Sequence, residues 1–207
     1  MLQQYDIDKY GKEILLQDNQ HQVMMEWEKP YMEACIDKLQ PKGDVLEIGF
    51  GMGYSATHIQ KYKPKSHTII EMDKIVIKRL REWAKDYDNI IIVEGIWQEK
   101  IHDLGKFDEM FFDDFPLRIP ETDIEKKTLS ERVFMFLDIC AYNHVKPNTR
   151  ISTYIQDTKG RFKERMKDNQ YYIYKEDYFI IDIPDNCNYY RGNKCIVPLI
   201  KYYNRRL

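Results

Sequence analysis

The 207-residue chain lacks the features that mark several large classes of protein. No apolar run has the length that a membrane-spanning helix needs. The first residues have neither the basic region nor the apolar region of a secretory signal. The four cysteines form no Cys-x-x-Cys pair and have no histidine at metal-ligand spacing. We therefore expect a cytoplasmic protein with reduced thiols, no membrane partner and no metal.

An excess of charge of either sign is also missing. The sequence has 32 lysines and arginines against 34 aspartates and glutamates, a formal net charge of −2. Because so weak a mean field does not attract polyanions, nucleic acid is not an expected partner. The length is enough for one domain with a substantial core.

The sequence does contain a short apolar run, 45–48, that ends in three glycines at alternate positions. These are Gly49, Gly51 and Gly53, and residues 54–60 after them can form a helix. Glycine allows a positive φ and a close approach of the backbone to a ligand, and the N–H groups at a helix start attract polar or anionic groups. The stretch predicts a strand, a tight turn and a helix that hold a nucleotide-like cofactor at the edge of a parallel sheet.

The details of this turn indicate which cofactor it holds. A dinucleotide fingerprint needs glycine where Tyr54 stands, and a phosphate loop needs a Gly-Lys-Ser/Thr ending that the sequence lacks. The pattern begins instead with Glu47 and reads acidic-x-Gly-x-Gly-x-Gly, which resembles motif I of class I S-adenosylmethionine (SAM) methyltransferases. Because SAM has no phosphate, an acid beside the loop is tolerable and can help to hold the amino-acid moiety. A turn without any ligand is the alternative interpretation.

Strands and helices are expected to alternate along the chain. Apolar runs predict parallel strands at 44–48, 67–71, 89–94, 107–112 and 150–155. Helices between them would cover both faces of the sheet. Two long strands, 171–183 and 195–203, suit an antiparallel edge hairpin. The expected fold is α/β: a Rossmann-like class I methyltransferase with a mostly parallel seven-stranded sheet, an antiparallel C-terminal hairpin and helices on both faces.

The chain divides into residues 1–20 and one SAM-dependent methyltransferase domain, 21–207. The first segment is polar and has little periodicity, so it is a flexible tail or a lid over a pocket. Composition alone favours the tail.

Three residues near strand or helix ends have a functional interpretation and a simpler one. Glu71 lies at a distance from the glycines that suits a carboxylate accepting both ribose hydroxyls, or it is a solvated strand-end glutamate. Trp97 covers an adenine ring or belongs to the core. Glu28 lies just before Pro30, which starts or kinks a helix, so the carboxylate can turn inward. An isolated glutamate is more often on the surface.

Two blocks carry a specific resemblance. The first is Met-x-x-Trp-Glu-x-Pro-Tyr-Met over 24–32, and the second is Asp-Asp-Phe-Pro-Leu over 113–117. Together with the glycine loop and the tail around Tyr189-Tyr190, they resemble the guanidinoacetate N-methyltransferase family from about residue 21 to 203. Fungal-type arginine methyltransferases share the Ile-Ile-Glu of 69–71. The resemblance implies SAM as cofactor, S-adenosyl-L-homocysteine (SAH) as product and a small guanidino substrate; we expect a monomer or a homodimer.

The resemblance also implies the residues of the site. The two catalytic carboxylates would be Glu28 and Asp113. The cofactor would contact Met24, Met32, Glu47, Ile48, Gly49, Phe50, Gly51, Met52, Gly53, Glu71, Met72, Trp97 and Gln98. The substrate would contact Glu28, Asp113, Asp114, Asp157 and Thr158. Taken alone, Met24 and Met32 are more often core residues than cofactor contacts.

The chemistry of a guanidinium fits two carboxylates. The group is planar, cationic and forked, so a carboxylate can bind it bidentately. It stays protonated far above neutral pH and is a poor nucleophile until it loses a proton. We expect Asp113 to take that proton during an in-line displacement at the sulfonium methyl, while Glu28 orients the substrate.

The sequence departs from the family at two places. Asp114-Phe115 stands where the family has Thr-Tyr, and Asp157 adds a second acid near the fifth strand. A more negative pocket would repel the carboxylate of guanidinoacetate. Arginine, agmatine and a peptide arginine therefore remain possible substrates.

Other functions stay open at this point. A protein arginine N-methyltransferase uses the same site chemistry. A nucleic-acid methyltransferase would place an Asp-Pro-Pro-Tyr-like motif after the same strand, and 113–116 is distantly similar to it, while the basic residues of 159–167 are more often a solvated face. The last alternative is a non-catalytic subunit with the SAM fold.

Overall fold

A seven-stranded sheet forms the centre of the molecule. The computed structural model describes residues 3–115, 129–156 and 160–203, and its strand order is β6-β5-β4-β7-β8-β10-β9. The strands are β4 (Asp44–Ile48), β5 (Ser66–Glu71), β6 (Ile90–Glu94), β7 (Phe107–Phe112), β8 (Val145–Thr153), β9 (Tyr172–Ile180) and β10 (Lys194–Tyr202). The first five run parallel, and β10 is antiparallel to both β8 and β9. This confirms the predicted fold class, including the C-terminal hairpin.

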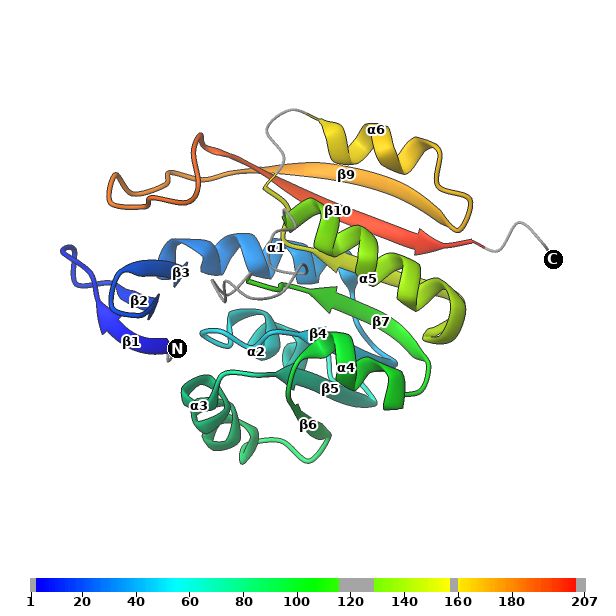
Figure 1. Cartoon of the computed structure of the whole chain (residues 1–207), viewed down its shortest axis with the longest axis horizontal. Coiled ribbons are helices and arrows are strands. Elements are labelled where there is room, and N and C mark those ends of the chain that lie inside the picture. The colour runs from blue at the N-terminus through cyan, green and yellow to red at the C-terminus, as the bar shows by residue number, and fades with distance from the viewer. Residues whose placement is uncertain (1–2, 116–128, 157–159, 204–207) are drawn as a thin grey trace.

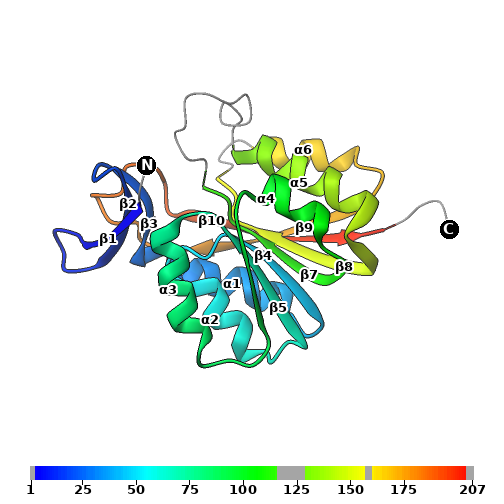
Figure 2. The ribbon, with the colours of Figure 1, turned by 60° about the horizontal axis from the view of Figure 1, so that its bottom comes forward.

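Helices cover both faces of the sheet. They are α1 (Lys29–Leu39), α2 (Tyr54–Lys61), α3 (Lys74–Ala84), α4 (Trp97–Lys100), α5 (Leu129–Asn143) and α6 (Arg161–Lys167), with short 3₁₀ helices η1 (Glu26–Glu28) and η2 (Ile101–Asp103). Figure 2 shows α1, α2 and α3 on one side of the sheet and α4, α5 and α6 on the other. Within the described residues, no helix is both long and apolar enough to cross a membrane.

Each face of the sheet has its own apolar core. Alternate residues of a strand point to opposite faces. In β4, Val45 packs with the side of α1–α3, whereas Leu46 and Ile48 pack with the side of α4–α6. In β7, Phe111 belongs to the first core and Phe112 to the second. This two-sided burial explains why the central strands read as continuous apolar runs.

Strand β8 begins earlier than the sequence predicts. It starts at Val145, and its pairing with β7 jumps from Phe107↔Val145 to Glu109↔Arg150. Pro147 lies inside this irregular stretch, where its missing N–H interrupts no regular ladder. The expected start at residue 150 is therefore only where regular pairing begins.

The N-terminal residues form strands rather than the tail that composition favours. Strands β1 (Gln3–Ile7), β2 (Glu13–Gln17) and β3 (His21–Met25) make a separate antiparallel sheet, drawn in blue in Figure 1. Its anchor is the fully buried Leu15. The Tyr5 hydroxyl donates to the Gly51 carbonyl oxygen at 2.7 Å, so this sheet touches the glycine loop. Movement of the sheet as a lid stays a prediction.

Arg79 of α3 holds the N-terminal sheet through two contacts. Its guanidinium lies 4.4 Å from the centre of the Tyr5 ring and pairs with the Glu13 carboxylate. We expect Arg79→Ala to speed amide hydrogen exchange in β1 and β2 about five- to thirtyfold, because the two contacts together contribute ~1–2 kcal/mol. Arg81→Ala on the same helix removes only an exposed pair with Glu94 and is the control. Equal exchange rates in the two variants would contradict this anchoring role.

Candidate active site

A cavity lies where the carboxyl ends of β4, β5, β7 and β8 meet the N-terminal sheet. Its described lining consists of Gln3, Leu15, Val23, Met24, Glu28, Ile48, Gly49, Gly51, Ile70, Glu71, Met72, Gly95, Trp97, Asp113, Asp114, Phe115, Tyr154, Gln156 and Tyr189. None of these lining residues is lysine, arginine or histidine, whereas four of them are acids. In parallel α/β sheets this edge is the usual ligand site.

The glycine loop is packed so tightly that Gly49 cannot carry a side chain. Its φ is +82°, and a Cβ atom there would lie 2.3 Å from the Asp113 carbonyl oxygen. The Asp113 N–H in turn donates to the Ile48 carbonyl oxygen at 3.0 Å. Glycine is needed here because it lets the loop after β4 and the residue after β7 lie against each other.

Glu71 ties this loop to the end of β5. Its carboxylate accepts backbone N–H groups from Phe50 at 2.9 Å, Met72 at 2.7 Å and Asp73 at 2.8 Å. Burial raises the pKa of Glu71, and the three N–H donors oppose that rise. The carboxylate is thus held at the cavity wall, where the sequence predicts the acceptor for ribose hydroxyls.

Glu28 points inward, as the functional interpretation requires. Pro30 lies in the first turn of α1, and η1 before it places the Glu28 side chain in the interior with 3% exposure. Glu28 Oε1 accepts the Met25 N–H at 3.0 Å and the Tyr189 hydroxyl. Burial first, and then the charge of Asp113, raise the pKa of Glu28 to about 8.

Asp113 shares this cavity with Glu28. Among the described residues, no group donates a hydrogen bond to its carboxylate. Burial, and then the charges of Glu47, Asp114 and Glu71, raise the pKa of Asp113 to about 7. The fold therefore brings the two predicted catalytic acids together, 85 positions apart in sequence, and leaves both short of donors.

Asp114 differs from its neighbour because its charge is compensated. Arg132 of α5 forms a buried ion pair with it, and the Trp97 indole N–H donates to the same oxygen at 2.6 Å. Burial raises the pKa of Asp114, and Arg132 opposes the rise. Asp114 therefore does not make the pocket more negative as expected. Asp157 and Thr158 lie outside the described residues.

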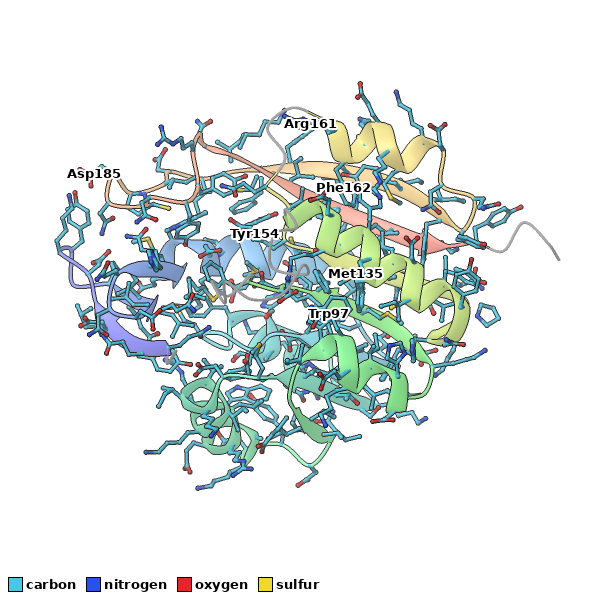
Figure 3. All side chains as sticks on the ribbon, in the orientation of Figure 1. Trp97, Met135, Tyr154, Arg161, Phe162 and Asp185 are labelled. Carbon is cyan, nitrogen blue, oxygen red and sulfur yellow. The ribbon has the colours of Figure 1, made fainter. Side chains whose placement is uncertain are left out.

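Trp97 belongs to the core and also lines the cavity, and its contact with an adenine ring stays a prediction. It is 4% exposed and packs edge-on against Phe112 and Phe136, yet it also lines the cavity. Figure 3 shows Trp97 and Tyr154 toward the centre of the molecule. The indole is positioned by the core and presents part of its surface to the site.

The predicted cofactor residues separate into two groups. The cavity is lined by Met24, Ile48, Gly49, Gly51, Glu71, Met72 and Trp97. The others lie behind or beside the lining: Met32, Glu47, Phe50, Met52, Gly53 and Gln98. Glu47 in particular is fully buried, where it accepts a hydrogen bond from Ser55 and pairs with His67 at 2.8 Å. Its carboxylate therefore lies behind the glycine loop, where it links Ser55 of α2 to His67 of β5.

Some lining residues were not assigned to the site by sequence reasoning. Tyr189 had a signal, because it belongs to the tail block of the family resemblance. Tyr154 and Gln156 follow the fifth parallel strand, where site residues are expected, but nothing marked them individually. Gln3 and Leu15 gave no signal, because their segment reads as a tail.

The cavity fits SAM on features of its own. A fixed carboxylate, Glu71, and a glycine loop that admits no side chain face the space, and Ile70 and Met72 add apolar surface. The described lining offers no cation for a phosphate. A cofactor with a ribose and without phosphate suits such a wall.

Solved structures share this architecture. An O-methyltransferase from Bacillus cereus in complex with SAH has a TM-score of 0.58 at 11% identity and covers 87% of this chain and 82% of that chain. Spermidine synthase from Thermotoga maritima has a TM-score of 0.64 at 18% identity and covers 97% and 68%. Fold and site together define an enzyme of the SAM-dependent methyltransferase class, which implies SAM as its cofactor.

The family is narrower than the class. A model of guanidinoacetate N-methyltransferase matches residues 5–179, and the chain belongs to that family. Protein arginine N-methyltransferase 2 of Candida glabrata is 38% identical over 113 residues, which make up 51% of this chain and 27% of that protein. Its counterpart in Saccharomyces cerevisiae is 36% identical over 107 residues, or 48% and 26%. The matches thus cover only a minor part of these longer relatives.

The raised pKa of Glu28 makes stability depend on pH. Between about pH 4.5 and 8 the folded protein keeps a proton that the unfolded chain has lost, so stability falls as pH rises through this window. We expect Glu28→Gln, which keeps an acceptor for Tyr189, to remove about half of the fall in Tm between pH 5 and 8, with Asp113 causing the rest. Glu94→Gln, at an exposed glutamate, should keep the wild-type slope. An unchanged slope in Glu28→Gln would show that this carboxyl is not the titrating group.

The position of Glu71 predicts its effect on cofactor binding. Glu71→Ala removes the expected ribose acceptor, the bond from Phe50 of the glycine loop and the bonds from Met72 and Asp73, so SAH affinity measured by calorimetry should fall about 100-fold or more. The control is Glu94→Ala, because Glu94 pairs with Glu71 in register at the end of β6 but is exposed. It should bind SAH within about twofold of wild type. Equal losses in both variants would remove the special role of Glu71.

Proposed function

We propose that this methyltransferase transfers the methyl group of SAM to a nitrogen of a guanidino compound. One observation carries the proposal: the buried Glu28 and the half-buried Asp113 line the same cavity as the glycine loop, and the described lining supplies no cation to compensate them. Two buried like charges are unfavourable until a cation lies between them. A guanidinium is the cation whose shape matches two carboxylates.

The hydrogen bonds already made by each acid leave room for such a substrate. Glu28 Oε1 is occupied by Met25 and Tyr189, so Oε2 is available. The Asp113 carboxylate keeps both oxygens available among the described residues. A guanidinium between them would favour the ionised forms and so lower the pKa of each acid. Substrate binding would therefore ionise Glu28 and Asp113, the two acids that bind the substrate.

The two acids take different roles in the reaction. Bound SAM supplies an electrophilic methyl group. Glu28 is fixed from two sides and holds the orientation and charge of the substrate. Asp113 touches the glycine loop through its backbone and accepts the proton that the attacking nitrogen loses as its bond to carbon forms. The pKa of Asp113 is about 7 in the free protein, and a bound guanidinium lowers it, so the carboxylate is ionised and able to accept the proton near neutral pH.

The structure changes the argument about which guanidine is the substrate. The expectation against guanidinoacetate depended on two extra acids, and Asp114 is neutralised by Arg132. Guanidinoacetate therefore stays a candidate beside arginine and agmatine. We propose the same partner and assembly that we expect from the sequence: a small guanidino compound as partner, and a monomer or homodimer.

A second candidate is methylation of arginine in a protein or peptide. The observation in its favour is the name of the curated relatives, protein arginine N-methyltransferase 2. The site chemistry is the same, and only the size of the substrate differs.

A methyl-transfer assay with isotopically labelled SAM tests the proposal. The panel contains guanidinoacetate, arginine, agmatine, an arginine peptide, and duplex and single-stranded nucleic acid. We expect label on at least one guanidine and none on nucleic acid. Binding of SAH without turnover of any guanidine would overturn the proposal, and label on the peptide alone would favour the second candidate.

The role of Asp113 gives a sharper prediction. Asp113→Asn should reduce kcat about 10²- to 10⁴-fold, because a positioned base is lost, while SAH affinity stays close to wild type. Asp108→Asn is the matched control, since Asp108 lies at the opposite end of β7. It should leave turnover within about twofold. A wild-type rate in Asp113→Asn would exclude this mechanism.

A further inference from the structure

One buried polar group at the cavity has no hydrogen-bond partner among the described residues of the free protein. The side-chain oxygen of Tyr154 is buried and makes no hydrogen bond with any described residue. Tyr154 itself is 7% exposed and lines the same cavity as Glu28 and Asp113. An unpaired buried hydroxyl is unfavourable, so its retention needs an explanation.

Other buried or half-buried tyrosines of the protein show how unusual this is. The Tyr31 hydroxyl donates to the Ile196 carbonyl oxygen at 2.7 Å, and the Tyr172 hydroxyl donates to the Leu137 carbonyl oxygen at 2.8 Å. Tyr189 donates to Glu28. The fold evidently pairs buried phenols where the partner is part of the scaffold.

The Tyr154 ring is held in a fixed place. Its backbone N–H donates to the Phe112 carbonyl oxygen at 3.2 Å, directly before Asp113. The ring packs against Tyr31 with centroids 5.6 Å apart and against Tyr190 at 6.2 Å. The backbone bond and the ring packing therefore fix Tyr154 at the cavity that Glu28 and Asp113 also line.

The charges around this hydroxyl are those of the site. Glu28 from η1 and Asp113 after β7 both raise the pKa of Tyr154, after burial, and Tyr190 and Cys195 act in the same direction. No lysine or arginine contributes. The phenol consequently keeps its proton and remains a donor.

We propose that Tyr154 is a positioning residue of the guanidine site, whose hydroxyl donates a hydrogen bond to the Glu28–Asp113 pair once a bound cation has ionised it. This inference rests on the proposed function. In the free protein the acids hold protons and offer the phenol little. With substrate bound, the extra carboxylate charge gives the hydroxyl its partner, and the bond stabilises the ionised acids.

The test compares Tyr154→Phe with Tyr172→Phe, using the guanidine that the wild type methylates. Losing the donor raises the pH at which the acids of the substrate complex ionise, so the acidic limb of kcat, which reports that complex, should move up by about one pH unit in Tyr154→Phe. Well below the limb that shift is about a tenfold loss, and it should vanish two pH units above the limb. Because the lost hydroxyl was unpaired, the Tm of the free protein should be unchanged or higher, with SAH affinity unchanged.

Tyr172→Phe should do the opposite. It leaves the Leu137 carbonyl without its donor, so Tm falls while the pH profile stays that of the wild type. A wild-type profile in Tyr154→Phe, or an equal loss at every pH, would overturn the inference and leave the proposed function standing. Failure of the wild type to methylate any guanidine would overturn both.

Discussion

The molecule depends on two uncompensated acids that share one cavity, the buried Glu28 and the half-buried Asp113. Burying a charge is costly unless it is paired. The buried cation nearby, Arg132, is engaged with Asp114, and the described lining offers none to the other two. The free site therefore keeps protons, with a pKa of about 8 for Glu28 and about 7 for Asp113. The described lining of the cavity has no positive side chain, and for this reason we expect its substrate to be a cation.

A stiff scaffold is needed to hold such a site. Asp113 is fixed by the tight contact between its backbone and Gly49, which ties β7 to β4. Glu28 is fixed by a short 3₁₀ turn between the N-terminal sheet and α1. The two apolar cores on either face of the sheet stabilise these strand ends. Their packing offsets the unfavourable free energy of placing two acids in one cavity.

The bounds of the central strands 44–48 and 107–112 could be predicted from sequence to the residue, because each is a short, mostly apolar segment that ends at a glycine loop or an acidic pair. The N-terminal sheet could not: its strands are short, and Leu15 is buried only against distant segments. Glu47 was assigned to the cofactor because motif spacing does not say which face of a strand a residue occupies. The alternation of side chains along a strand does say which face. Glu47 points to the same face as Val45, and Val45 is paired in β5 with His67, the residue that binds the Glu47 carboxylate. The pairing of Glu28 with Asp113 required the tertiary fold.

The N-terminal sheet meets the loop between β9 and β10 beside the site, and their contact is coupled to the charge of the site. The loop between β9 and β10 joins the N-terminal sheet through the Tyr10 hydroxyl, which donates to Asp185 at 2.6 Å, and through Gln22, which donates to the Asn186 carbonyl oxygen at 2.7 Å. The same loop carries Tyr189 to Glu28. That bond lowers the pKa of Glu28 against the effect of burial. By reciprocity an ionised Glu28 binds the Tyr189 hydroxyl more strongly than a protonated Glu28 does. A bound cation that ionises Glu28 therefore also strengthens the contact between this loop and the site.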